Sequence, residues 1–134
     1  MAEGSRYASS GVRWQVPRRH GALAQARAAL HGTLAGWGWP SERIDVVVLV
    51  ACELLTNAHR HAGGDAGLAV RATKRGIWLA VDDGERAVPV RRDTGPEVEG
   101  GFGLHILDTV ADRWGVAARA DGKAVWAEID RVVA

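Results

Sequence analysis

The feature that most constrains the fold is the segment from Ser41 to about Ala62, which predicts one long helix with apolar residues on two sides. One stripe at helical spacing is an ordinary core face, formed by Ile44, Val48, Ala51, Leu55, Ala58 and Ala62. On the opposite side a second apolar group precedes Glu53 and Asn57, and it consists of Val46, Leu49 and Val50. Because a helix that is apolar on both sides needs cover on both, we expect this helix to be buried between other elements.

The other segments predict strands in hairpins beside separate helices. Helices are expected at Arg18–Leu34, Ser41–Ala62 and Leu104–Ala111, with Ser41 as the N-cap of the second. Alternating apolar residues predict strands at Val12–Val16, Leu68–Ala72, Ile77–Val81, Val116–Ala118 and Val125–Ile129. The first of these strands reads as a sheet edge. The order of elements predicts an α/β two-layer sandwich, in which a mixed, mostly antiparallel sheet packs against three helices.

Length and composition restrict the classes of protein. A chain of 134 residues suits one domain, which we expect at 11–134, after a disordered N-terminus at 1–10. A formal net charge of +1 predicts no nucleic-acid partner. The longest apolar run, Val46–Cys52, is too short to span a bilayer, and a single cysteine permits no internal disulfide. We therefore expect a cytoplasmic protein without a membrane partner.

Glu53 and Asn57 are the first candidates for chemistry. Their i, i+4 spacing places both side chains on one face of the helix, about a turn apart. The Asn carbonyl oxygen suits Mg²⁺, and a Glu one turn away could deprotonate a nucleophile beside that metal. The alternative is a polar pair on a solvated face, which the apolar neighbours of this pair argue against.

A second group of candidates borders a long loop. The strand Ile77–Val81 continues in register to Asp83, whose buried carboxylate would need a strong hydrogen-bond donor such as the amino group of a purine. Gly84 then opens a stretch without periodicity that runs to Gly101. The glycines of Gly100–Gly103 precede a helix and could bind phosphate through backbone N–H groups. A surface turn and a flexible hinge are the alternative readings of these two glycine-containing segments.

Three motifs occur in a characteristic order along the chain. They are ELLTNAHRHA at 53–62, VDDG at 81–84 followed by Pro89, and GFGLHILD at 101–108. In this order they resemble the N box and two glycine boxes of the gyrase, histidine kinase and MutL (GHKL) ATPase superfamily, whose domain has the Bergerat ATP-binding fold. Segments 111–115 and 122–128 are similar to the end of its short bacterial branch, the anti-sigma factor serine kinases of the RsbW and SpoIIAB type.

The resemblance implies a role for each motif. Glu53 would be the general base that activates the attacking hydroxyl or water, and Asn57 would coordinate the Mg²⁺ that bridges the ATP phosphates. The adenine amino group would be bound by Asp83, or by Asp82 if the motif is aligned as Asp-x-Gly. Strand alternation favours Asp83, and 85–100 would form the ATP lid. The implied nucleotide-binding residues are Asn57, Asp82, Asp83, Gly84, Gly101, Phe102, Gly103 and Leu104.

The resemblance also implies an activity and partners. The protein would transfer the γ-phosphoryl group of ATP to a serine of a partner protein, act as a homodimer, and bind a sigma factor and an anti-sigma factor antagonist protein. A nucleotide-sensing module without kinase activity is the main alternative, and a detached histidine kinase catalytic domain is another. Glu85 and Ala124 replace residue types usual in the family and favour the sensing module, whereas Glu53 favours the kinase.

Overall fold

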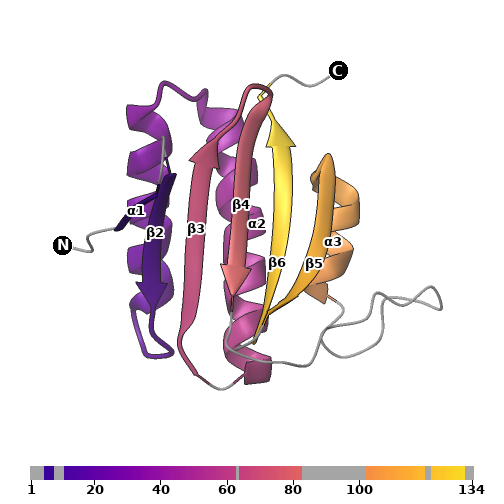
Figure 1. The fold of residues 1–134 in the computed structure, drawn as a ribbon. Helices are drawn as coiled ribbons and strands as arrows, with labels where there is room; N and C mark the ends of the chain where they lie inside the picture. The colour runs from indigo at the N-terminus through magenta and orange to yellow at the C-terminus, as the bar shows by residue number, and fades with distance from the viewer. Residues whose placement is uncertain (1–4, 8–10, 63, 83–101, 120–121, 132–134) are drawn as a thin grey trace.

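The computed structural model of the chain contains a sheet of six strands in the order β1-β2-β3-β4-β6-β5 (Figure 1). The strands are β1 (Ser5–Tyr7), β2 (Gly11–Val16), β3 (Ala66–Ala72), β4 (Gly76–Asp82), β5 (Arg113–Arg119) and β6 (Gly122–Asp130). The structure describes residues 5–7, 11–62, 64–82, 102–119 and 122–131. All five pairings between these described strands are antiparallel, so the sheet is not mixed in this part of the chain.

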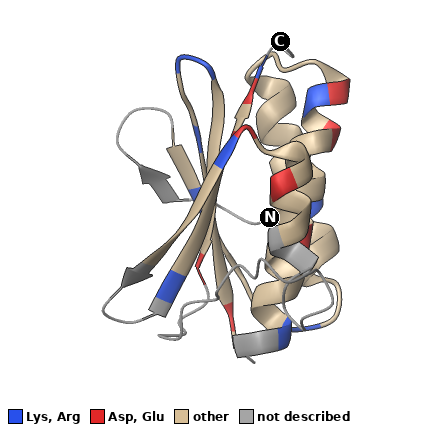
Figure 2. Ribbon diagram, turned by 90° about the vertical axis from the view of Figure 1, so that its right-hand side faces the viewer, with Lys and Arg blue, Asp and Glu red and all other residues tan. Residues whose placement is uncertain are grey.

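The helices form a second layer on one face of the sheet (Figure 2). They are α1 (Ala22–Gly36), α2 (Ser41–Ala62) and α3 (Phe102–Val110). Side chains of β4 alternate between the two faces of the sheet, and Ile77 and Leu79, which are 0% exposed, point into the core. Leu34 of α1 and Leu107 of α3 meet this face with the same exposure of 0%. The predicted α/β two-layer sandwich is therefore confirmed.

The N-terminal part of the fold differs from the sequence prediction in two places. The strand predicted at the sheet edge, β2, lies inside the sheet, because β1 pairs along its outer side with Arg6 opposite Val12. β1 falls within residues 1–10, for which the sequence predicts no regular structure. In addition, α1 begins at Ala22 rather than Arg18, because Gly21 takes a left-handed backbone conformation with φ of 87° directly before the helix.

The central helix, α2, has the predicted bounds but only one fully buried side. Its first helical hydrogen bond runs from the Ile44 N–H to the Pro40 carbonyl at 3.0 Å, so Pro40 and not Ser41 holds the N-cap position. Val50 is 0% exposed, whereas Leu49 is 43% exposed. The helices form a single layer with α1 and α3 on either side of α2, so no described helix packs on its outer side (Figure 1). The expectation of cover on both sides is therefore wrong at Leu49.

No helix in the described part of the chain has the length and apolar character needed to cross a membrane. The longest, α2, has 22 residues.

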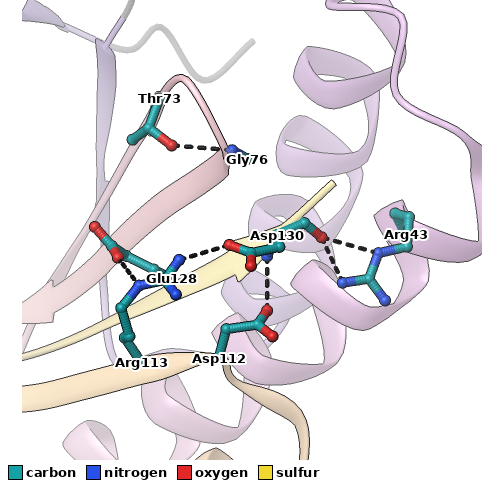
Figure 3. Close-up of polar contacts among 7 residues, drawn as sticks. All are labelled: Arg43, Thr73, Gly76, Asp112, Arg113, Glu128 and Asp130. Atoms are coloured by element: carbon teal, nitrogen blue, oxygen red, sulfur yellow. Dashed lines mark hydrogen bonds and ion pairs between the residues drawn. The ribbon is translucent and has the colours of Figure 1, made fainter. Parts of the chain in front are cut away.

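One end of the sheet is tied together by polar contacts (Figure 3). We call it the turn end; it is marked by Gly76 and Asp130, which pair across β4 and β6. Arg113 forms ion pairs with Glu128 and, at 2.5 Å, with Asp130 Oδ1. These hydrogen bonds raise the pKa of the Arg113 guanidinium above its usual range, so it stays charged. Arg43 of α2 donates to the Asp130 carbonyl at 2.6 Å, which joins the helix layer to this end of the sheet.

Candidate functional site

The opposite end of the sheet carries the motifs singled out in the sequence. We call it the site end; it is marked by Asp82, which pairs with Gly67 of β3 and with Ala124 of β6. The C-terminal half of α2 and the N-terminus of α3 lie over this end, the lower one in Figure 1. Strand order and helix direction thus bring the N box of α2 and the end of β4 to the same end of the molecule.

Glu53 and Asn57 project from one flank of α2. Leu54, which follows Glu53 in the sequence, is 2% exposed and faces the core, and this fixes the rotation of the helix. His59 lies on the other flank and contacts Val16 of β2, so Glu53 and Asn57 face the side of α2 on which α3 lies. Both side chains are half-buried, and neither has a hydrogen-bond or ion-pair partner within the described residues. Glu53 and Asn57 thus place a half-buried carboxylate and a half-buried carboxamide one turn apart on α2.

Three contacts hold the C-terminal end of α2 against the end of β2. A ring nitrogen, His59 Nε2, lies 3.0 Å from the Val16 carbonyl oxygen. Arg18 donates through Nε to the His59 carbonyl at 2.9 Å, and its backbone N–H donates to Asp65 Oδ1 at 3.3 Å. These contacts fix the helix turn that follows Asn57. These contacts could not be predicted from the sequence, because they depend on which strand the helix end meets.

The side chain of Asp82 lies on the sheet face without helices. Arg13 of β2 contacts it through Nη2, at 3.1 Å from Oδ2 and 3.3 Å from Oδ1. Asp82 therefore points away from the side of the sheet that carries Glu53 and Asn57. This placement supports the alignment in which Asp83, and not Asp82, binds adenine. Asp83 itself lies outside the described residues.

The other predicted nucleotide-binding residues lie at or beyond the start of α3. Gly84 and Gly101 fall outside the described residues, as does the predicted lid at 85–100. Phe102, Gly103 and Leu104 form the first turn of α3, which begins two residues before the predicted Leu104. Their backbone is therefore at a helix N-terminus, where N–H groups can bind an anion.

Two neighbouring residues of β6 lie on opposite faces at the site end. Ala124 pairs with Asp82 and shares its helix-free face, so a hydroxyl at position 124 would point away from Glu53 and Asn57. Lys123 has the opposite orientation, in step with the core residues Val125 and Ala127. At 7% exposed, it is the one buried charged residue among those that the structure describes. The sequence reasoning missed Lys123, because its burial depends on the register of β6.

Asn57 supplies an oxygen donor of the kind that suits Mg²⁺. Within the described residues, no group of three or more His, Cys, Asp and Glu side chains could hold a metal ion. Asn57 offers a hard amide oxygen that is not engaged within the described part of the chain. Mg²⁺ at nucleotide sites takes few protein ligands and completes its coordination with phosphate oxygens and water.

A family model of the histidine kinase-like ATPase domain matches residues 16–129. The chain belongs to this family. The match extends from Val16, the last residue of β2, to Ile129 near the end of β6, and it includes all three motifs. No curated protein matches the chain at a significant level. Membership in the histidine kinase-like ATPase family indicates that the domain binds ATP.

Proposed function

We propose that this histidine kinase-like ATPase domain binds Mg²⁺-ATP at the site end and transfers the γ-phosphoryl group to a serine of a partner protein. The observation that carries the proposal is the half-buried pair Glu53 and Asn57, which has no partner within the described residues. A carboxylate and a carboxamide one turn apart supply a general base and a magnesium ligand, which are the two groups that phosphoryl transfer requires from this helix.

The chemistry assigns a separate task to each residue. Asn57 holds through its amide oxygen the Mg²⁺ that neutralises charge on the phosphates. Glu53 accepts the proton of the serine hydroxyl while the serine oxygen bonds to the γ-phosphorus and the bond to the departing ADP oxygen breaks. Asp83 accepts a hydrogen bond from the adenine amino group, and the N-terminal N–H groups of α3 bind phosphate oxygens.

The charge of the site end supports an anionic ligand. Lys123 places a buried cation on the helix-facing side of β6, within the same end of the sheet. Positive charge on this side of the sheet favours an anionic ligand such as the phosphates of ATP. We propose a sigma factor and an anti-sigma factor antagonist as the protein partners, with the domain acting as a homodimer.

A thermal-shift series tests the nucleotide first. ATP with Mg²⁺ raises the melting temperature if it binds the folded domain, and the rise grows with the logarithm of its concentration. ATP with EDTA, and Mg²⁺ alone, are the controls. The absence of any shift with ATP or ADP contradicts the proposal.

Labelled ATP then separates a kinase from a nucleotide-sensing module. We expect label from the γ-phosphate, but not from the α-phosphate, to appear on a serine of the partner protein. Binding of ATP without such transfer to any candidate partner favours the sensing module. Ala124 lies on the helix-free face, which weighs against reading its missing hydroxyl as support for that alternative.

A further inference from the structure

We infer that the ion pair between Arg13 and Asp82, together with Gly67 beneath it, is a positioning device for the nucleotide base. This inference rests on the proposed function, because it concerns the adenine contact assigned to Asp83. Arg13, Gly67 and Asp82 come from three adjacent strands, β2, β3 and β4, at the site end of the sheet. None of them touches the nucleotide in this proposal; they act on the strand that carries its aspartate.

The geometry of the pair depends on the absence of a side chain at Gly67. A Cβ built on Gly67 would lie 2.5 Å from Arg13 Cζ and 2.7 Å from Asp82 Oδ2. The ion pair therefore crosses over the backbone of β3 and occupies the space above it. Because the atoms in the way are the ends of two side chains, an alanine at this position would displace the pair and leave the strands in place.

The ion pair holds the end of β4, next in the sequence to the proposed adenine ligand. Asp82 is the last residue of β4, and the chain then enters residues 83–101. Asp82 is followed directly in the sequence by Asp83, the proposed adenine ligand, so a change in how Asp82 is held reaches that residue first. Both partners are about a quarter exposed, with side-chain values of 29% and 27%, so the contact is shielded in part from water.

A second ion pair on the same sheet provides a matched control. Arg113 and Glu128 pair at the turn end, with side-chain exposures of 36% and 30%. They join the neighbouring strands β5 and β6 through a guanidinium and a carboxylate, whereas Arg13 and Asp82 join β2 to β4 across β3. Arg113→Ala also removes the ion pair with Asp130, so it costs at least as many surface contacts as Arg13→Ala, but only Asp82 is followed by the proposed adenine ligand. A structural effect is common to both pairs, whereas an effect on base recognition is confined to the first.

The test compares ATP with inosine triphosphate, which lacks the adenine amino group, by isothermal titration calorimetry of the full chain with Mg²⁺. We expect Arg13→Ala and Gly67→Ala to weaken ATP binding about tenfold, the scale of one lost hydrogen bond to a charged group, and to leave inosine triphosphate affinity unchanged. Arg13→Lys retains the preference, because a single nitrogen of Arg13 makes both contacts. Arg113→Ala lowers the melting temperature and keeps the wild-type ratio of the two affinities.

Three results overturn the inference. If Arg13→Ala and Gly67→Ala keep the wild-type preference for ATP, the pair has only a structural role. If Asp82→Asn removes the preference for ATP while Arg13→Ala keeps it, Asp82 contacts the base itself. If the wild-type chain does not bind ATP, the proposed function fails and the inference fails with it.

Discussion

The two ends of the sheet differ in how their polar groups are used. At the turn end, Asp130 binds Arg113 through its side chain and Arg43 through its backbone carbonyl, which joins β5 and β6 to α2 (Figure 3). At the site end, Glu53 and Asn57 are half-buried and have no partner within the described residues. Polar groups that stabilise a fold find partners within it, whereas groups that bind a ligand have to be left open. The contrast is the basis on which we propose that the turn end maintains the fold and that the site end binds the ligand.

The largest expected effect comes from the base at the site end. Glu53→Gln keeps the shape of the side chain and removes its ability to accept a proton, so we expect phosphoryl transfer to fall at least about a hundredfold. ATP affinity should change little, because the base does not hold the nucleotide. Single-turnover transfer of labelled phosphate measures the rate, and Glu42→Gln on the exposed first turn of α2 is the control. Equal rates for Glu53→Gln and the wild type would remove the base from this end.

A smaller effect is expected from the magnesium ligand. Asn57→Ala removes the amide oxygen, and we expect Mg²⁺-dependent ATP affinity to fall about tenfold, or roughly 1.4 kcal/mol. Titration of ATP at several Mg²⁺ concentrations measures the loss. Thr56→Ala, at the exposed neighbouring position of the same helix, is the matched control. A loss of affinity that is the same with and without Mg²⁺ argues against a metal ligand at Asn57.

At the turn end we expect the reverse pattern. Arg43→Ala removes two hydrogen bonds to the Asp130 carbonyl, at 2.6 and 3.2 Å, and should lower the free energy of unfolding by about 1 kcal/mol. Urea unfolding measures this change, and titration of the same variant with ATP should show wild-type affinity. A loss of ATP affinity in Arg43→Ala would show that the two ends are not independent.

The smallest effect is expected between the two ends, on the outer side of α2. Leu49 is 43% exposed, so Leu49→Gln should change the free energy of unfolding by less than about 0.5 kcal/mol. The comparison is Leu54→Ala on the buried side of the same helix, which we expect to cost about 2–5 kcal/mol. Strong destabilisation by Leu49→Gln in dilute solution would indicate that this side is covered after all.

The sequence predicts local features of this fold better than contacts between distant segments. The periodicity of Ser41–Ala62 gives the bounds of α2 and the shared face of Glu53 and Asn57, because both depend only on helix geometry. Strand alternation likewise separates Asp82 from the core face. Leu49 shows the limit of this reasoning, because its exposure depends on the number of helix layers, which periodicity does not report.

Contacts that depend on register could not be predicted. The partner of Asp82 is Arg13, which is 69 residues away in the chain. The burial of Lys123 and the outward position of Ala124 follow from the pairing of β6 with β4, which one residue of slippage would reverse. Sequence patterns therefore identified the helix that carries the site, whereas the surroundings of the site required the structure.

The close approach over Gly67 also restricts how this sequence can diverge. A side chain at position 67 would fill the space that the Arg13 and Asp82 side chains share, so the ion pair could no longer form there. Substitutions at these three positions should therefore accompany one another during evolution, although the positions are far apart in the chain.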